Sequence, residues 1–275
     1  MSATTSDGAR IEVRGLTKRF GSFVAVDDLS FDVEPGRITG FLGPNGAGKT
    51  TSLRMILGLV NATSGTATID GHRYVDLPNP LGTVGAALEA TNFHPGRSGR
   101  DHLRVLADAG SIPLTRVDEL LELTGIPAAA RKRAGEYSMG MRQRLGLAAA
   151  LLGDPKVLVL DEPSNGLDPE GIRWLRGFLR HLSSEGKTIL VSSHLLTEVQ
   201  QTVDEVVIIA NGRLVRSGSI ADLEGTRGAV VRTSDAGRLA GALRVADVTS
   251  TIDADGTLLA DTTDLRLIGD VALRA

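Results

Sequence analysis

The sequence contains no cysteine. This absence excludes disulfide bonds, zinc sites with cysteine ligands and catalysis by a thiol. It fits a reducing compartment, so we expect a cytoplasmic protein. Positive charge is not in excess either, because the formal net charge at pH 7 is −3. A dedicated nucleic-acid binder needs clustered lysine and arginine to neutralise phosphates, so we expect no nucleic-acid partner.

Long hydrophobic runs are also missing. No stretch of about 18 apolar residues occurs, and we therefore expect that the chain does not span a membrane. Residues 1–10 are small and polar and lack the basic-then-apolar pattern of a secretory signal.

The composition is that of an ordinary globular protein, with 41% hydrophobic residues in a chain of 275. That length suits one large α/β domain, or one domain with a small appendage. Alternating segments at 11–13 and 29–33 predict strands of an N-terminal antiparallel β subdomain. The segment 37–42 predicts a short apolar strand, and the apolar run at 157–160 is typical of a strand buried on both faces of a mainly parallel sheet.

Further elements complete this organisation. Strands are predicted at 66–70, 82–88, 188–192, 205–210 and 213–216, and helices at 50–59, 172–184 and 195–202. Leucines at helical spacing predict an inserted helical subdomain at about 90–152. The composition changes after Gly225, where strands at 229–233 and 257–262 and a helical turn at 239–243 are expected. We therefore predict a main domain at 9–224 and a small C-terminal α+β domain at 225–275.

A glycine-rich loop joins the strand at 37–42 to the helix that follows. It fits G-x-x-x-x-G-K-[ST] with Gly43, Pro44, Asn45, Gly46, Ala47, Gly48, Lys49 and Thr50. Its glycines let backbone N–H groups converge on a triphosphate at the positive end of a helix. We expect Lys49 to bind the β- and γ-phosphates, Thr50 to bind Mg²⁺, and Thr51 to contact the nucleotide as well. The alternative is a chance glycine-rich turn, which the fixed lysine and the strand–helix setting disfavour.

Two carboxylates follow the apolar strand at 157–160. A strand end at this point can place Asp161 on a magnesium ion and Glu162 beside an attacking water. Taken alone, such a pair is often only a solvated strand end. The upstream phosphate loop favours the chemical interpretation, because the metal and the water both need a carboxylate there.

Five motifs now stand in a fixed order. They are the 43–50 loop, Ser138-Met139-Gly140-Met141-Arg142-Gln143, Asp161-Glu162, Gly166-Leu167-Asp168 and His194. This order resembles the nucleotide-binding subunits of ABC transporters over about residues 10–220. The resemblance implies a P-loop NTPase cassette of the α/β class that binds ATP and Mg²⁺. It also implies ATP hydrolysis, with Glu162, Lys49 and His194 as the catalytic residues.

The resemblance also assigns residues to a dimer interface and to a phosphate sensor. Ser138 and Gly140 match the family's signature motif, which closes over the γ-phosphate held by a second copy at a helix N-terminus. Asp168 matches a loop that crosses the same dimer interface. His194 matches the switch histidine that contacts the γ-phosphate.

Two more positions are assigned in the same way. Phe20 matches the aromatic residue that stacks on adenine, and Phe23 is a nearby alternative for that role. Glu89 stands where the family usually has a glutamine that senses Mg²⁺ and the attacking water. We therefore expect Glu89 to join Thr50 and Asp161 around the metal.

The signature and Glu89 both depart from the common family pattern. Met139 replaces a glycine, which we expect to tighten or redirect the signature loop, and Glu89 adds negative charge near the metal. Both departures, with Ala86-Ala87-Leu88-Glu89 and Phe93-His94-Pro95, resemble the ATPases of bacitracin- and daunorubicin-type exporters, whose membrane subunit is a separate protein.

The expected function is therefore to energise an exporter of drugs, antibiotics or lipids. The expected partners are a second copy, forming a head-to-tail dimer, and an integral-membrane permease. The resemblance implies a peripheral place on the inner face of the cell membrane. A soluble ABC ATPase is the first alternative, disfavoured by the single cassette and the absence of a long heptad run. An importer ATPase is the second. The cargo is not specified by this chain.

Overall fold

The computed structural model describes residues 8–88, 93–195, 200–220, 222, 229–233, 235–253, 256–262 and 264–274. The chain forms two compact units, Met1–Gly218 and Ser219–Ala275. The first unit ends a few residues before the boundary predicted from the sequence. Each unit is described by itself.

An antiparallel sheet forms the N-terminal part of the first unit, as the alternating segments predicted. Its strands are β1 (Ile11–Phe20), β2 (Phe23–Val33) and β4 (Ser64–Ile69), in the order β2-β1-β4. Gly21 has a φ of +57° in the two-residue turn between β1 and β2, a backbone conformation that glycine adopts without strain. This turn brings Phe20 and Phe23 directly opposite each other at the hairpin tip.

A six-stranded sheet forms the centre of the first unit. Its strands in spatial order are β5 (Val84–Ala87), β6 (Val157–Leu160), β7 (Thr188–Ser193), β3 (Ile38–Leu42), β8 (Glu205–Ala210) and β9 (Arg213–Ser219). The pairings from β5 to β8 are parallel. Strands β3, β6 and β7 are buried throughout, which explains the continuous apolar sequence of β6. Because these strands are parallel, the loops after β3, β6 and β7 meet at one edge of the sheet.

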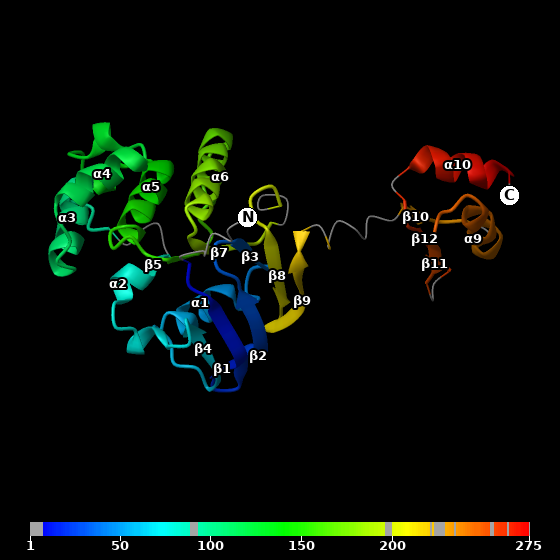
Figure 1. The fold of residues 1–275 in the computed structure, drawn as a ribbon, viewed down its shortest axis with the longest axis horizontal. Helices are drawn as coiled ribbons and strands as arrows, with labels where there is room; N and C mark the ends of the chain where they lie inside the picture. The colour runs from blue at the N-terminus through cyan, green and yellow to red at the C-terminus, as the bar shows by residue number, and fades with distance from the viewer. Residues whose placement is uncertain are drawn as a thin grey trace, which may run out of the picture. The chain divides into compact units, whose positions relative to one another are not determined.

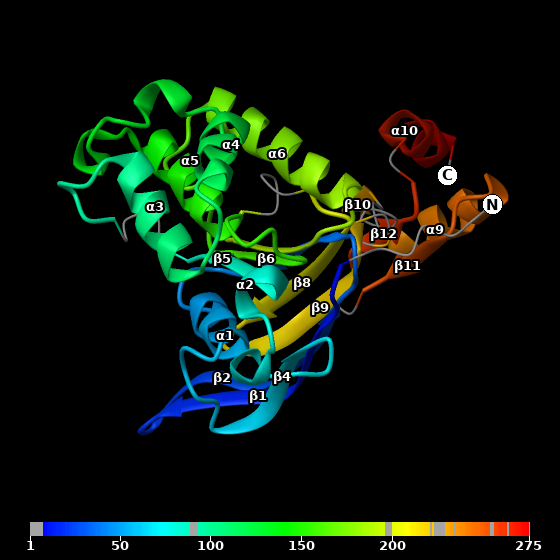
Figure 2. The same cartoon turned by 60° about the vertical axis from the view of Figure 1, so that its left-hand side comes forward.

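The helices lie on both faces of this sheet. They are α1 (Lys49–Ile56), α2 (Pro80–Thr83), α3 (Gly99–Ala109), α4 (Thr115–Leu123), α5 (Met139–Ala150) and α6 (Pro169–Ser184). Figure 2 shows α6 and the inserted group α3–α5 on one side of the sheet, and α1 with the antiparallel sheet on the other. The strand predicted from residue 82 was wrong at its start. Asn79 caps α2, and Pro80 occupies its first turn.

A hydrophobic core lies between the two sheets and around α1. Phe31 of β2 and Phe41 of β3 stack there with ring centroids 5.3 Å apart. This contact joins the antiparallel sheet to the strand that carries the glycine-rich loop. Among the described residues, no helix is long and apolar enough to cross a membrane.

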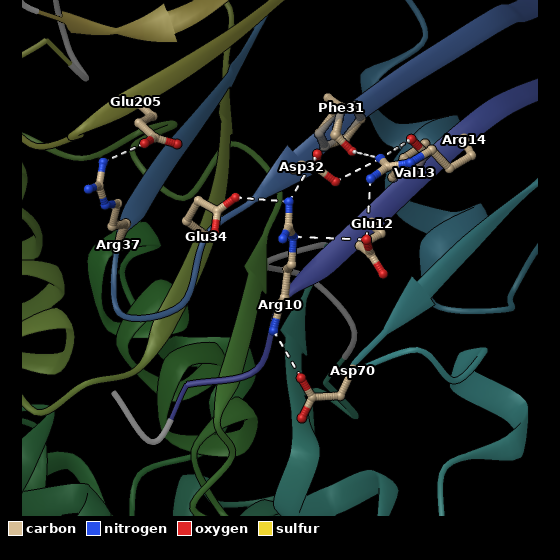
Figure 3. Close-up of polar contacts among 10 residues, drawn as sticks. All are labelled: Arg10, Glu12, Val13, Arg14, Phe31, Asp32, Glu34, Arg37, Asp70 and Glu205. Atoms are coloured by element: carbon tan, nitrogen blue, oxygen red, sulfur yellow. Dashed lines mark hydrogen bonds and ion pairs between the residues drawn. The ribbon is translucent and has the colours of Figure 1, made fainter. Parts of the chain in front are cut away.

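A charged network crosses strands β1 and β2 (Figure 3). Arg10 pairs with Asp32 at 3.2 Å and with Glu34 at 3.1 Å, while Arg14 pairs with Asp32 at 2.7 Å and with Glu12 at 3.2 Å. Burial alone would raise the pKa of Asp32, but hydrogen bonds and attraction from Arg14 and Arg10 lower it below its ordinary value. The network therefore favours the ionised form of Asp32.

The second unit is a small α+β fold, as the sequence predicted. Its antiparallel strands are β10 (Ala229–Val231), β12 (Leu258–Ala260) and β11 (Ser250–Ile252), and its helices are α9 (Ala236–Val245) and α10 (Leu265–Arg274) (Figure 1). A separate core contains Leu239, Leu243 and Leu258. The sequence did not predict β11 or α10, and four residues of the helix expected at 195–202 lie outside the described residues.

Candidate functional site

The glycine-rich loop connects β3 to α1, and its backbone leaves no room for side chains at two positions. A Cβ on Gly43 would lie 2.4 Å from the carbonyl oxygen of Ile209. At Gly48, where φ is +103°, a Cβ would lie 2.6 Å from the carbonyl oxygen of Ala25. These contacts explain the glycines physically and identify a constrained turn rather than a flexible one.

Neighbouring strands hold the loop in place. The Gly43 amide donates to the Ser193 carbonyl at 3.3 Å, and the Gly212 amide donates to the Ala47 carbonyl at 3.0 Å. The loop is therefore anchored from β7 and from the β8–β9 turn. A loop with this support can present its free amides in a fixed arrangement.

Lys49 starts α1 and is buried, with only 6% of its surface exposed. Its ammonium group donates to the carbonyl oxygens of Gly43 at 2.6 Å and Pro44 at 3.3 Å, and it lies 3.2 Å from Glu162 Oε1. A buried lysine needs such partners, because an unpaired charge away from water is costly. The structure thus brings the predicted lysine of the loop to the predicted carboxylate after β6.

Glu162 lies between two positively charged or protonatable groups. Its Oε1 faces Lys49, and its Oε2 lies 2.7 Å from Nδ1 of His194. Glu162 also has a left-handed backbone, with φ at +49°, and its amide donates to Ser192 Oγ at 2.9 Å. The carboxylate is consequently held at both oxygens and at its own backbone.

Thr50 and Asp161 form a second pair at the same edge of the sheet. Thr50 Oγ1 donates to Asp161 Oδ2 at 2.6 Å, and the buried Ser192 hydroxyl donates to Asp161 Oδ1 at 2.5 Å. Within the described ranges, no cluster of three or more His, Cys, Asp or Glu side chains forms a metal cage. A hydroxyl beside one carboxylate instead suits Mg²⁺, which keeps several waters and shares its coordination with phosphates.

Ser192 was not predicted as a site residue. It connects the Asp161 carboxylate with the Glu162 backbone, because its hydroxyl donates to Asp161 Oδ1 and accepts from the Glu162 amide. Its position in β7, two residues before His194, is the only signal that the sequence carries for this role. The parallel pairing of β7 with β6 places Ser192 beside the two residues that follow β6.

A cavity of about 360 Å³ opens between the loop and Glu162. Its lining residues are Phe23, Ala25, Asn45, Gly46, Gly48, Lys49, Thr50, Thr51, Glu162 and Asn165. The lining includes Phe23 and not Phe20, whose ring is 52% exposed and carries Lys18 Nζ at 4.9 Å from its centroid. The stacking role of Phe20 therefore stays a prediction, with Phe23 as a stronger rival than the sequence indicated.

The predicted signature residues lie away from this cavity. Ser138 caps α5, since its Oγ accepts from the Met141 amide at 3.3 Å, and Asp168 caps α6 by accepting from the Gly171 amide at 2.8 Å. Both line a separate cavity of about 210 Å³ together with Gly140. Within one chain the structure therefore does not bring these residues to the loop. Glu89 lies outside the described residues.

Comparison with known proteins shows which family has this combination of fold and site. Residues 26–165 match the family described as "ABC transporter". The chain is 41% identical over 216 residues to the bacitracin transport ATP-binding protein BcrA of Enterococcus faecalis, covering 78% of this chain and 70% of that protein. It is 33% identical over 205 residues to the lantibiotic transport ATP-binding protein SrtF of Streptococcus pyogenes, covering 74% and 89%.

A solved structure agrees with the fold. An ATP-binding subunit of an ABC transporter superposes with a TM-score of 0.70 and 28% identity, covering 78% of this chain and 91% of that one. The predicted cassette fold and the resemblance to bacitracin transport ATPases are thus confirmed. The chain belongs to the ABC transporter family, as an ATP-binding and ATP-hydrolysing subunit that energises transport.

Proposed function

We propose that this subunit drives an exporter of drugs, antibiotics or lipids, and that it hydrolyses ATP with Mg²⁺ in a head-to-tail dimer. The observation that carries the catalytic part is the pairing of Glu162 with both Lys49 and His194. The export assignment is supported by relatives named for bacitracin and lantibiotic transport and by a Nod factor export ATP-binding protein.

Glu162 is the residue that orients the attacking water. Its carboxylate is anchored by Lys49 and His194, so it can accept a hydrogen bond from water with little reorganisation. Lys49 binds the β- and γ-phosphates and stabilises the charge that spreads over the transferred group. His194, held at Nδ1 by Glu162, keeps its other ring nitrogen for the γ-phosphate.

The Thr50 hydroxyl and the Asp161 carboxylate are the groups that would hold Mg²⁺. Bound there, the ion neutralises negative charge on the phosphate oxygens. Asp161 stays oriented by Ser192 whether or not Thr50 donates to it. Glu89 is proposed as a further metal-side group, where its carboxylate adds negative charge in place of the amide common in the family.

A second copy completes each site in this proposal. Ser138 and Gly140 lie at the N-terminus of α5, whose amides and dipole favour a γ-phosphate. Because they line a different cavity from the loop of their own chain, they suit the nucleotide of a partner. Asp168 is placed at the same interface. A separate integral-membrane permease docks near residues 89–101, which puts the protein on the inner face of the membrane.

The decisive test is Glu162→Gln. We expect steady-state ATP hydrolysis to fall by at least about 100-fold, the contribution of a positioned general base, while ATP binding persists. Glu185→Gln is the matched control, because Glu185 directly follows α6 and, among the residues that the structure describes, pairs with His181 at the surface. Hydrolysis at the parental rate in Glu162→Gln would refute the catalytic assignment. Co-purification with a membrane protein, and ATPase stimulation by its cargo, test the exporter assignment.

A further inference from the structure

The start of α5 lies against the segment 165–174 of its own chain. A Cβ on Gly166, where φ is +72°, would lie 2.8 Å from Cγ of Met139. A Cβ on Gly140 would lie 3.5 Å from Leu167. The signature loop is thus in contact with the loop that leads into α6.

Arg144, one turn further along α5, adds a second contact between α5 and α6. Its guanidinium carbon lies 3.7 Å from the centroid of the Trp174 ring on α6, and Nη1 donates to the Thr124 carbonyl at 2.9 Å. Trp174 in turn stacks on Phe178 at 5.0 Å. Burial lowers the pKa of Arg144, while Glu170 and Asp168 act in the opposite direction. One side chain therefore connects the end of α4, the signature helix and α6.

We propose that Arg144 and Trp174 form a latch that positions the signature residues Ser138 and Gly140 for the nucleotide of the second copy. The latch makes the start of α5 and the 165–168 loop move as one body. The two elements therefore keep the same position relative to each other when they contact the second copy. The inference rests on the proposed dimeric function, but Arg144 itself touches no nucleotide and acts through the loop it holds.

Met139 has a role in the same latch. Gly166 has no side chain, and this leaves the space in which the Met139 side chain lies. Met139 thereby restores packing at a position where the common family pattern has a glycine. A methionine suits this packing position because its flexible side chain fills irregular gaps.

Arg144→Gln is the direct test. We expect kcat for ATP hydrolysis to fall about tenfold, within the range that a partly desolvated cation–π contact can supply. The dissociation constant for ADP, which lacks the γ-phosphate that Ser138 and Gly140 are proposed to contact, should change less than about twofold. Arg104→Gln is the matched control, since Arg104 is exposed on α3 of the same inserted helical group, pairs with Asp101 at 3.6 Å and belongs to none of the five motifs. Its kcat should remain parental.

A double-mutant cycle with Trp174→Leu separates positioning from general destabilisation. If the two side chains act together, Arg144→Gln should lower kcat much less in the Trp174→Leu background than in the parent. Arg144→Lys should recover only part of the loss, because lysine lacks the planar group that stacks. Far-UV circular dichroism reports whether each variant remains folded, because Trp174 is the single tryptophan and the Trp174→Leu background has no tryptophan fluorescence.

Three results would contradict the latch. The first is a parental kcat in Arg144→Gln. The second is strictly additive effects of the two substitutions on kcat in the double-mutant cycle. Weaker ADP binding in step with kcat would also contradict it, by showing damage to the loop's own site. A parent protein without ATPase activity would instead refute the proposed function, and the two failures are therefore distinguishable.

Discussion

Replacing Ser192 with alanine removes the hydroxyl that holds the Asp161 carboxylate and the Glu162 backbone after β6. In the parent, Ser192 donates to Asp161 at 2.5 Å and accepts from the Glu162 amide at 2.9 Å. Ser192 itself is fully buried, whereas Asp161 and Glu162 are half-buried. The variant therefore loses two hydrogen bonds, and water replaces part of them.

The size of the effect follows from these contacts. A hydrogen bond to a charged group contributes about 1.5–3 kcal/mol and a neutral one about 1 kcal/mol, so with partial compensation we expect a loss of about 2 kcal/mol in unfolding free energy. Glu162 also loses the anchor of a left-handed backbone residue. A small displacement of its carboxylate should lower kcat about tenfold, or about 1.4 kcal/mol in activation free energy.

Urea unfolding and steady-state ATP hydrolysis measure the two effects. Ser183→Ala is the matched control, because the Ser183 hydroxyl donates to the Gly36 carbonyl at 3.0 Å, away from the carboxylates. It should lose about 1 kcal/mol of stability and keep the parental kcat. Parental kcat in Ser192→Ala, with a stability loss no larger than in the control, would refute the bridging role.

Two further predictions concern the nucleotide base and the charged network. Phe20→Ala or Phe23→Ala, whichever removes the ring that stacks on the base, is expected to weaken ATP binding about tenfold by calorimetric titration, because a base–aromatic stack contributes about 1–3 kcal/mol. Unchanged binding excludes the ring concerned. Asp32→Asn should lower the unfolding free energy by about 1 kcal/mol at pH 7 and low salt, since these pairs are partly exposed and screened. The pKa of Asp32 is lowered in the folded state. The difference in unfolding free energy between parent and variant should therefore persist above about pH 4 and disappear as the pH falls through that lowered pKa. A difference that does not depend on pH or salt would contradict this account.

The residues of the site were predictable where the signal is local. The 43–50 loop and the Asp161-Glu162 pair are recognisable because each follows a continuously apolar strand. Local signals failed at residues 82–83, where the Asn79 cap and Pro80 start a helix instead of a strand. They also failed for β11 and α10, which are short and depend on a core supplied by other segments of the second unit.

Contacts between distant segments were decided only by the tertiary structure. Thr50 and Asp161 are 111 residues apart and meet because β6 and β3 flank β7 in a parallel sheet. Parallel pairing has no local sequence signature, so neither the bridge at Ser192 nor the stacking of Arg144 on Trp174 was foreseeable. The sequence by itself determined the chemistry available at each strand end, because that depends on residue type and neighbours. The structure decided which ends meet, because strand order and helix packing arise from burial summed over the whole chain.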